Sequence, residues 1–493
     1  MSEIFYNIIG GKPVVLPDTA WFESCNPADT RDCLGRFPQS SPHEVAQAAQ
    51  AAQQAAPEWA TTPAPTRASL LREAVVALER HGEELARLMT REMGKPLRES
   101  RGEIAKAIAE CHFMLGEAHR LNGATVPSER RHVWAQTVRV PIGPVAAITP
   151  WNFPLITPLR KIMPALVMGN PVVLKPSEET PLTALRLAEV MNAAGLPPGV
   201  LNLVTGGPAT GAALVDHPAI RAVTFTGSTA TGRAIAAAAG RRLVRVQAEM
   251  GGKNPAVIWD APDLADAVRQ VVGAAFACSG QRCTAISRVI VPRTEAPVVA
   301  EALLGEIATL RPGNGLDPET TLGPLISAAH RERVHGYVMR AVAEGARLLM
   351  GGEPLTGETF DNGYFYAPTL LSDVVGSMEI ARAEVFGPVL CLMPVASFQE
   401  ALALANDVEY GLAAAIFTRH LDLAGHFVDG VQAGIVHVNH GTAIESHLPF
   451  GGLKASGLGP GSIGTSTKEF FTDIKTVYVK YGPSIALAAN AEQ

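Results

Sequence analysis

The length, composition and charge of this chain exclude several classes of protein. Its 493 residues exceed one ordinary domain and suggest roughly three structural units. Hydrophobic residues make up 47% of the chain and charged residues 18%, which is typical of a globular protein and excludes a disordered one. The 41 Lys and Arg residues are outnumbered by 47 Asp and Glu residues, and the net charge of −6 argues against nucleic acid as a partner.

The N-terminus and the cysteines indicate a protein of a reducing compartment. The sequence begins without the basic and apolar segments of a signal peptide, and no apolar run has the length of a membrane span. The six cysteines form no CxxC pair and no Cys/His cluster with zinc spacing, so we expect no metal site. They are also too sparse for a disulfide scaffold. We therefore expect a cytoplasmic protein with free thiols, of which one or two at most are reactive.

Helical patterns dominate the first quarter of the chain. Ser41-Pro-His-Glu44 has the form of a capping box with Pro at the first helical position, and it predicts a helix over 41–56. Apolar residues at helical spacing predict a second helix over 66–93 and a third over 97–121. Cys111 falls on the apolar face of the third helix, so we expect it in the core.

Further along the chain the pattern changes to short β-rich runs separated by helical stretches. These runs are Val145–Ile148, Val172–Leu174, Leu201–Val204, Ala222–Phe225 and Leu243–Val246. Repeated strand–helix–strand units predict a parallel sheet with helices on both faces, which binds ligands at the carboxyl ends of its strands. A second α/β series begins at Pro255–Trp259 and continues to Val436–Val438. The segments 131–140 and 476–480 alternate like exposed strands.

Two motifs that follow predicted strands carry side chains suited to a substrate or a sugar. Pro150-Trp-Asn-Phe-Pro154 is held extended by its prolines, and Asn152 there can aim its amide at a developing oxyanion. The alternative is a rigid proline turn. In Lys175-Pro-Ser-Glu178 the Lys and Glu can bond sugar hydroxyls, and a carboxylate suits a ribose 2′-hydroxyl. The alternative is a solvated charge pair.

Two further motifs combine glycine with a functional group. Phe225-Thr-Gly-Ser228 stands at a strand-to-helix turn, where Gly lets a phosphate approach the helix N-terminus. Glu249-Met-Gly-Gly-Lys-Asn254 places a carboxylate beside apolar Met250, where its pKa can rise and it can act as a base. In isolation, each is more often an ordinary turn with a solvated side chain.

Gly280-Gln-Arg-Cys283 contains a candidate nucleophile. Its polar, Gly-rich setting follows a predicted helix over 263–277 and suggests an accessible thiol, although a lone Cys is more often inert than catalytic. Cys278 stands at the apolar end of that helix and is interpreted as a packing residue.

Taken in order, these motifs resemble those of the aldehyde dehydrogenase superfamily, most of all its succinate- and 2-oxoglutarate-semialdehyde dehydrogenases. The series is Pro150-Trp-Asn-Phe-Pro, Lys175-Pro-Ser-Glu, Phe225-Thr-Gly-Ser, Glu249-Met-Gly-Gly-Lys, Gly280-Gln-Arg-Cys, Glu384-Val-Phe-Gly-Pro-Val and Pro449-Phe-Gly-Gly-Leu-Lys-Ala-Ser-Gly. The resemblance covers about Pro27 to Tyr478, and the spacing of 34 residues from Glu249 to Cys283 also fits.

The resemblance implies an α/β, aldehyde dehydrogenase-like fold in three parts. A Rossmann-type coenzyme domain, which binds the dinucleotide, is expected from 1–118 and 142–252, and an α/β catalytic domain from 253–469. Segments 119–141 and 470–493 are expected to form a β-strand oligomerisation arm, because exposed strand edges pair with a second subunit. A homodimer or a homotetramer is the expected assembly.

The resemblance also implies a covalent mechanism. Cys283 attacks the aldehyde to give a thiohemiacetal and then a thioester. The Asn152 side chain and the backbone N–H of Cys283 form the oxyanion hole. A hydride passes to the nicotinamide, and Glu249 activates the water that hydrolyses the thioester.

Further residues are assigned to the cofactor by the same resemblance. They are Thr149, Trp151, Lys175, Ser177, Glu178, Gly227, Ser228, Glu384 and Phe386. Glu384 matches a carboxylate that holds the nicotinamide ribose, and Phe386 matches a residue that packs near the nicotinamide. Glu178 favours NAD, and NADP is the alternative.

Two arginines suggest the class of substrate. Arg160 stands where members similar to succinate-semialdehyde dehydrogenases carry Arg, and Arg282 directly precedes the nucleophile. Because a guanidinium binds a carboxylate in bidentate fashion, the hypothesis is a semialdehyde that carries a carboxylate. The alternatives are that these arginines pair with internal acids such as Glu445, and that the substrate is an uncharged aldehyde.

The chain departs from the family pattern at 439–447 and 456–461, both expected at the substrate entrance. Two rival functions are a CoA-acylating dehydrogenase, in which a thiol replaces water, and a non-catalytic binding protein of the same fold. The presence of both Glu249 and Cys283 argues against each of them.

Overall fold

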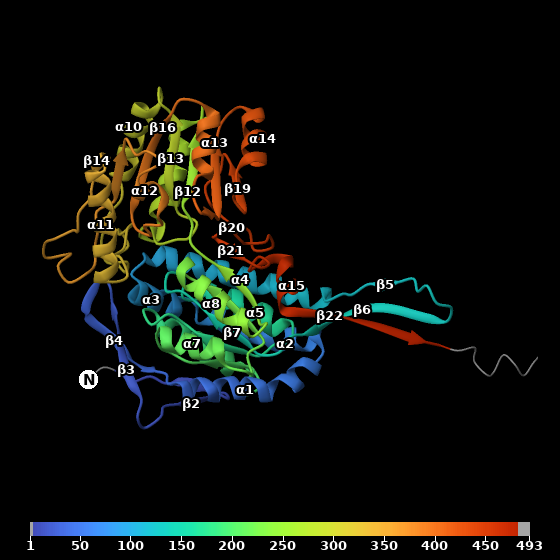
Figure 1. The fold of residues 1–493 in the computed structure, drawn as a ribbon. Helices are drawn as coiled ribbons and strands as arrows, with labels where there is room; N and C mark the ends of the chain where they lie inside the picture. The colour runs from blue at the N-terminus through green and yellow to red at the C-terminus, as the bar shows by residue number, and fades with distance from the viewer. Residues whose placement is uncertain (1–2, 482–493) are drawn as a thin grey trace, which may run out of the picture.

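The computed structural model describes residues 3–481 and contains two stacked α/β units, each built on one sheet (Figure 1). The first sheet has the strand order β2-β1-β9-β8-β7-β10-β11-β21. Its strands are β1 (Asn7–Ile9), β2 (Lys12–Val14), β7 (Val145–Ile148), β8 (Val172–Lys175), β9 (Leu201–Leu203), β10 (Ala222–Thr226), β11 (Arg245–Glu249) and β21 (Gly457–Leu458). Strands β7 to β11 pair in parallel, as predicted. The strand order reverses between β7 and β10, and such a reversal opens a crevice at the carboxyl ends of the strands.

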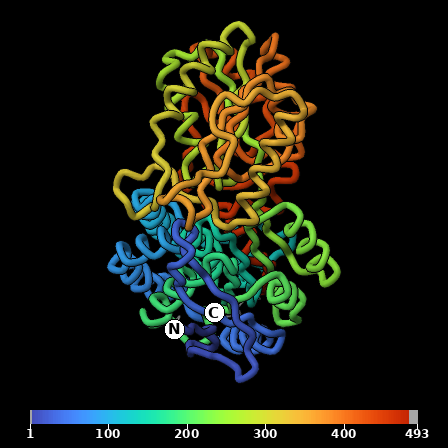
Figure 2. Tube along the Cα trace, turned by 90° about the vertical axis from the view of Figure 1, so that its left-hand side faces the viewer, coloured from blue at the N-terminus to red at the C-terminus, as the bar shows by residue number. Residues whose placement is uncertain are grey.

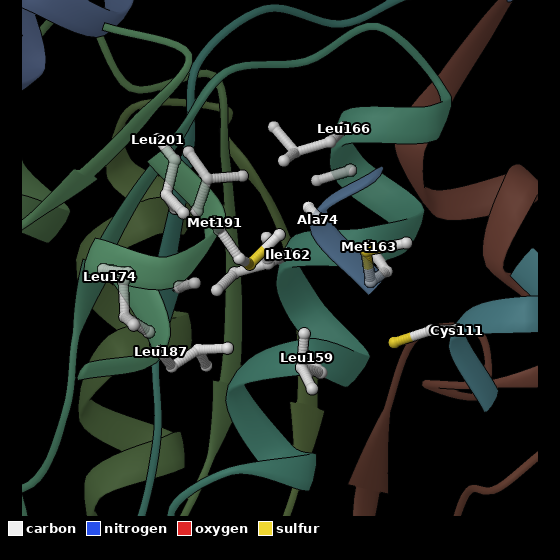
Figure 3. Close-up of a cluster of buried hydrophobic side chains, with 14 of the residues drawn as sticks. Ala74, Cys111, Leu159, Ile162, Met163, Leu166, Leu174, Leu187, Met191 and Leu201 are labelled. Atoms are coloured by element: carbon white, nitrogen blue, oxygen red, sulfur yellow. The ribbon is translucent and has the colours of Figure 1, made fainter. Parts of the chain in front are cut away.

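Helices cover both faces of this sheet. They are α1 (Pro42–Thr61), α2 (Ala64–Arg80), α3 (Gly82–Met93), α4 (Leu97–Glu117), α5 (Ile156–Val167), α6 (Pro181–Ala193), α7 (Pro208–Asp216) and α8 (Thr229–Arg241). Alternate residues of β7 separate the two cores, because successive side chains of a strand point to opposite faces. Val145 and Ala147 join the core formed with α2, α4, α5 and α6, whereas Ala146 and Ile148 join that formed with α1, α7 and α8. Figure 3 shows part of the first core, and Cys111 is buried in it as predicted.

The second unit repeats this layered plan. Its sheet has the order β14-β15-β16-β13-β12-β18-β19. The strands are β12 (Asn254–Ile258), β13 (Ile286–Pro292), β14 (Arg347–Met350), β15 (Thr369–Ser372), β16 (Val389–Val395), β18 (Ala413–Phe417) and β19 (Ile435–Val438). The helices are α9 (Leu264–Phe276), α10 (Ala296–Ile307), α11 (Ala328–Ala343), α12 (Glu379–Arg382), α13 (Phe398–Asn406) and α14 (Leu421–Gly430). Seen from the side, the yellow-to-orange segments of this unit lie above the blue-to-green N-terminal half (Figure 2).

Smaller elements connect the two units. They are the hairpin of β3 (Ala20–Asn26) and β4 (Asp29–Gln39), the pair of β17 (Tyr410–Gly411) and β20 (Leu453–Lys454), and the short helix α15 (Thr467–Phe471). The hairpin contacts both units, since the Arg91 guanidinium bonds Asp32 at 2.7 Å while Tyr364 N donates to Pro27 O at 2.9 Å. The hairpin therefore helps to fix one unit against the other.

Three strands form an arm that extends away from both units (Figure 1). They are β5 (Thr125–Val126), β6 (Val133–Pro141) and β22 (Thr472–Lys480). β22 pairs antiparallel with β6 from Thr472 opposite Pro141 to Lys480 opposite Val133. The two segments predicted as exposed strands thus pair with each other, and β22 is one edge strand of the sheet, while the short β5 is the other. Residues 482–493 of the predicted arm lie outside the described residues.

Several predicted boundaries were wrong for local reasons. The helix predicted over 66–93 is two helices, because His81 ends α2 and Gly82 begins α3, where a Cβ would lie 3.3 Å from Ile104. The first helix continues to Thr61, beyond the predicted end, and keeps the predicted capping box. The strand predicted at 243–246 starts two residues later, because Leu243 adopts φ +57° in an exposed turn after α8.

Candidate active site

A cavity of about 850 Å³ lies where the loops after β7, β10 and β11 meet loops of the second unit. Ten of the fourteen residues predicted for the site line it. They are Trp151, Asn152, Arg160, Gly227, Ser228, Glu249, Arg282, Cys283, Glu384 and Phe386. The other four, Thr149, Lys175, Ser177 and Glu178, follow β7 and β8 at the same edge of the first sheet but are not part of the cavity wall.

Cys283 is held in a loop that the chain reaches through a left-handed turn. Cys278 and Ser279 have φ values of 55° and 56°. The turn is fixed by hydrogen bonds, in which Cys278 N donates to the Glu99 carboxylate at 2.8 Å and Ser279 Oγ donates to Gly323 O at 2.7 Å. Cys278 itself is buried, as predicted, with its sulfur 3.7 Å from that of Met93.

The thiol of Cys283 borders the cavity and is half-buried. Burial raises its pKa to about 11, the charge of Glu384 acts in the same direction, and the cations Arg160 and Arg282 oppose the rise. At neutral pH the group is therefore a thiol. Its attack on an electrophile requires that a base remove the proton or that a bound ligand stabilise the thiolate.

The amide of Asn152 is positioned beside the same loop. Its Nδ2 donates to Gln281 O at 2.8 Å, two residues before Cys283, which leaves one N–H for another acceptor. The backbone carbonyl oxygen of Asn152 accepts a hydrogen bond from Lys95 Nζ at 2.9 Å. Lys95 is in turn paired with the buried Glu103, whose other oxygen accepts Leu155 N at 3.0 Å.

Glu249 ends β11 with its carboxylate at the cavity wall and only 4% exposed. Its Oε2 has no hydrogen-bond partner in the described part of the chain. Burial raises the pKa of this carboxyl to about 8, and the nearby cations Lys161 and Arg160 oppose the rise. An uncommitted carboxylate oxygen with a pKa close to neutrality is suited to accept a proton from water or a thiol.

Lys161 was not predicted as a site residue. It is fully buried on α5, and burial lowers its pKa while Glu249 raises it. Its Nζ donates to Phe225 O at 3.4 Å. The sequence carries no motif for this contact, because α5 and β11 are brought together only by the tertiary fold.

Glu384 reaches the cavity through the glycines that follow Glu249. Gly252 N donates to Glu384 Oε1 at 3.1 Å, and a Cβ at Gly251 would lie 2.1 Å from Oε2. Only a residue without a side chain fits at Gly251. Burial raises the pKa of Glu384 to about 7, while the Gly252 N–H and the cations Lys253 and Arg333 oppose it.

An aromatic group closes one side of the cavity. Phe386 has φ +58°, and its ring meets that of Trp151 edge-on with 5.5 Å between centroids. His330 Nε2 donates to Phe386 O at 2.7 Å, and its Nδ1 accepts from Arg333 at 3.0 Å. Burial, with the charge of Arg333, lowers the pKa of His330 to about 4, so the imidazole is neutral. His330 was not predicted, since nothing in the sequence distinguishes it from other histidines.

The turn after β10 presents a helix N-terminus to the cavity. Gly227, Ser228, Thr229 and Ala230 line it, and Ser228 caps α8 by accepting Thr231 N. The open N–H groups and dipole of such a terminus attract anions.

Along the same sheet edge, the residues after β8 form a polar group. Lys175 Nζ donates to Gly206 O at 2.6 Å and lies 3.7 Å from Glu178 Oε2. Ser177 Oγ accepts Glu179 N at 3.3 Å. Thr149 Oγ1, after β7, is buried and has no hydrogen-bond partner between residues 3 and 481. These groups are placed to meet a ligand that extends from the cavity along the sheet edge.

The two predicted substrate arginines differ in their contacts. Arg160 forms a bidentate ion pair with Glu110, with Nε–Oε2 and Nη2–Oε1 distances of 2.8 and 2.7 Å. Its guanidinium also lies 5.2 Å from the centre of the Phe450 ring. The alternative of an internal acid therefore holds for Arg160, with Glu110 rather than the exposed Glu445 as the partner. Among residues 3–481, the Arg282 side chain forms a hydrogen bond only with the Thr284 hydroxyl, at 3.4 Å.

Comparison with known proteins identifies relatives along nearly the whole chain. The family model described as "Aldehyde dehydrogenase family" matches residues 15–477. An alpha-ketoglutaric semialdehyde dehydrogenase of Bacillus subtilis is 40% identical over 97% of this chain and 98% of its own. An alpha-ketoglutarate semialdehyde dehydrogenase of Haloferax volcanii is 38% identical over 98% of this chain and 100% of its own.

The structure also matches that of a betaine aldehyde dehydrogenase variant of Staphylococcus aureus in complex with NAD+. The TM-score is 0.94 at 32% identity, and the match covers 97% of each chain. Within residues 3–481, no helix is both long and apolar enough to cross a membrane.

Proposed function

Because the chain belongs to the aldehyde dehydrogenase family, we propose that its cavity oxidises an aldehyde to a carboxylic acid with Cys283 as the covalent nucleophile. The observation that carries this assignment is the convergence of three groups on one cavity: the thiol of Cys283, the amide of Asn152 and the uncommitted carboxylate of Glu249.

The first steps use the thiol and the oxyanion site. Glu249, or water beside it, takes the thiol proton, and the sulfur bonds to the aldehyde carbon to give a thiohemiacetal. The free N–H of Asn152 and the backbone N–H of Cys283 stabilise the oxygen that becomes negative. Loss of hydride from this carbon leaves a thioester on Cys283. NAD(P), when bound, accepts this hydride.

The last step uses Glu249 as a base. Its carboxylate removes a proton from water, the resulting hydroxide attacks the thioester, and the carboxylic acid leaves as the Cys283 thiol is restored. Because a base must be deprotonated, this step requires the ionised form of a group whose pKa is raised to about 8. The presence of this carboxylate favours hydrolysis over acyl transfer to CoA.

The residues present fit a dinucleotide. The α8 terminus at Ser228 offers a site for the pyrophosphate, and the unpartnered Thr149 hydroxyl lies beside the reversal of strand order. Trp151, Phe386 and Glu384 would hold the nicotinamide end. At the other end, Lys175 and Glu178 would hold the adenosine ribose, together with Ser177. Glu178 favours NAD because a carboxylate repels a 2′-phosphate.

The substrate proposed is a semialdehyde that carries a carboxylate, of about four to six carbons. Two relatives named for alpha-ketoglutarate semialdehyde support this choice. An uncharged aliphatic or aromatic aldehyde is the second candidate, favoured by the ion pair that occupies Arg160.

We also propose that the chain forms a homodimer or a homotetramer. The free edge of β22 and the exposed apolar residues of the arm support this assembly, because an unpaired strand edge is a template for pairing. The boundaries proposed for the three domains are those of the sequence analysis. The last parallel strand of the first sheet ends at Glu249 and the second sheet begins at Asn254, close to the proposed boundary at 252, while β21 (Gly457–Leu458) returns to the first sheet.

The test is the absorbance of NADH at 340 nm with succinate semialdehyde and NAD+, with and without CoA. We expect oxidation without CoA and a loss of at least about three orders of magnitude in the Cys283→Ala variant, which removes covalent catalysis. The Cys111→Ala variant, which removes a buried thiol far from the cavity, is the matched control. A strict requirement for CoA, or undiminished oxidation by the folded Cys283→Ala protein, would overturn the proposal.

A further inference from the structure

Five basic side chains line the cavity, and they differ in how their charges are compensated. They are Lys106, Arg160, Arg233, Arg282 and Arg333. Arg160 is paired with Glu110 at 2.7 Å, and Arg233 is paired with Glu409 at 2.9 Å. An ion pair of this kind leaves little charge to attract a second carboxylate.

The other three cations contact neutral groups. Arg333 bonds the neutral imidazole of His330, which anchors Phe386, so it belongs to the aromatic side of the cavity. Lys106 Nζ donates to Ile444 O at 2.6 Å, and Arg282 Nη2 lies 3.4 Å from Thr284 Oγ1. Within residues 3–481, neither Lys106 nor Arg282 has a carboxylate within ion-pair distance.

Lys106 and Arg282 are suited to bind a substrate by their positions and by their unused hydrogen-bond donors. Arg282 adjoins the nucleophile, and Lys106 projects from α4 beside the loop 441–444, which lines the same cavity. An ammonium has three donor hydrogens and a guanidinium five, so each side chain retains donors after its one protein contact. The carboxylate of Glu99 interacts electrostatically with Arg282. It forms no ion pair with Arg282 and instead accepts a hydrogen bond from the Cys278 N–H.

We propose that Lys106 and Arg282 bind the carboxylate of an ω-oxo acid substrate, while Arg160 is a structural ion pair that fixes α5 against α4. This inference rests on the proposed oxidation of an aldehyde at Cys283. It assigns the acid group of the substrate to the entrance formed by α4 and the loop 441–444, and the aldehyde to the thiol.

Lys106 has a second role, which follows from its contact with Ile444. The bond ties α4 to the loop 439–447, whose sequence departs from the family pattern. The ammonium is therefore already ordered at the entrance before a ligand arrives, which reduces the entropy lost on binding.

The test compares two aldehydes of equal chain length, succinate semialdehyde and butanal, with NAD+ as the oxidant. For Lys106→Met and for Arg282→Met we expect kcat/KM for succinate semialdehyde to fall by about 10- to 50-fold, mainly through KM, because each removes a charge-assisted contact. For butanal we expect a change of less than about twofold in Lys106→Met. In Arg282→Met the loss for butanal should be larger but still smaller than that for the acid, because Arg282 also opposes the rise in the pKa of Cys283. Lys106→Arg should retain most of the activity with the acid. Arg101→Met, on the solvent side of the same helix, is the matched control.

The Arg160→Gln variant tests the alternative that Arg160 itself binds the carboxylate of the substrate. Since Glu110 would be left without its partner, we expect lower stability and similar losses for both aldehydes. A loss confined to succinate semialdehyde would assign the carboxylate to Arg160 instead and overturn the proposal.

Ionic strength provides a measurement that needs no variant. Raising the salt concentration should lower kcat/KM for succinate semialdehyde and leave kcat/KM for butanal nearly constant. The reason is that salt screens the attraction between the two cations and the carboxylate of the substrate. Equal effects of the Lys106 and Arg282 substitutions on both aldehydes, or no effect on either, would overturn the inference while the oxidation at Cys283 stood. Failure of the wild-type protein to oxidise either aldehyde would instead contradict the proposed function.

Discussion

At the scale of single residues, burial disfavours the charged forms of the ionisable side chains in the site. Glu249, Glu384 and Lys161 are all buried at or near the cavity, and burial moves the pKa of each toward neutrality. Groups with a pKa in this range exchange protons near physiological pH. The thiol of Cys283 differs, because burial raises its pKa away from neutrality, to about 11, and so keeps it protonated.

The pair of Glu249 and Lys161 predicts a pH dependence. The hydrolytic step needs ionised Glu249, so kcat should rise with pH through an apparent pKa near 8. In Lys161→Met the cation that lowers the pKa of Glu249 is lost, and the rising limb should move to higher pH. A shift of one unit would lower kcat at pH 7 by about tenfold. Steady-state kcat between pH 6 and 10 measures the shift, and an unmoved or acid-shifted limb would contradict the coupling.

Asn152 predicts a loss of rate without a large loss of stability. In Asn152→Ala the oxyanion would lose one of two donors, which costs about 3 kcal/mol of barrier, or roughly two orders of magnitude in kcat. The comparison of kcat and thermal midpoint with the wild-type protein checks this. A fall in kcat of less than about threefold would remove Asn152 from the oxyanion site.

Sequence motifs predicted those residues whose signal is local, and missed those whose role depends on distant contacts. Cys283, Glu249 and Asn152 stand in recognisable motifs, and the structure brings them to one cavity. Lys161, Lys106 and His330 reach the same region only through the packing of α4, α5 and α11. No local pattern in the sequence marks these three residues as part of a site.

At the scale of elements, strand and helix types were predicted better than their ends. The five parallel strands of the first sheet were each found, because runs buried on both faces are nearly continuous in apolar residues. The break between α2 and α3 and the displaced start of β11 were missed. Both depend on left-handed or bridging backbone conformations at His81 and Leu243, which apolar periodicity does not encode.

The start of α5 depends on a buried ion pair, which gives a prediction of stability. Lys95 and Glu103 are 1% and 0% exposed, and together they hold Asn152 O and the amides of Leu155 and Ile156. Lys95→Met leaves the Glu103 carboxylate buried without a cation, which costs about 3–5 kcal/mol of unfolding free energy. Denaturant unfolding measures this loss.

The double variant Lys95→Met/Glu103→Gln is the control for the ion pair. It removes both charges, so part of the lost stability should return. Two results would contradict a role of this pair in supporting α5. One is a loss of less than about 1 kcal/mol of unfolding free energy in Lys95→Met, and the other is a further loss, rather than a recovery, when Glu103→Gln is added.

At the scale of the whole molecule, the arm predicts how subunits associate. Ile474 and Tyr478 are 60% and 71% exposed on one side of β22, the free edge of its sheet. Substituting both by Asp should reduce the particle mass toward that of one chain, 51.9 kDa, because charge on an exposed edge opposes pairing. Light scattering after size exclusion measures the mass. Leu421→Asp, an exposed apolar position on α14, should leave it unchanged. An unchanged mass in the arm variant would contradict an interface through the arm.

The overall architecture was accessible to sequence analysis because each α/β unit is specified by its own alternation of strands and helices. The relation between the units was not, since the cavity is formed by loops of both units that are far apart in the chain. The resemblance to a known family supplied that relation, and the matched family model spans residues 15–477.

In the proposed mechanism, Cys283 carries the acyl group until Glu249 activates water. The most direct measurement mixes the Glu249→Gln variant with succinate semialdehyde and NAD+, follows NADH in a rapid burst, and locates the acyl group by peptide mass spectrometry. We expect one NADH per subunit, then a stall, with the acyl group on Cys283. Undiminished steady turnover with unmodified Cys283, or an acyl group on another cysteine, would contradict it.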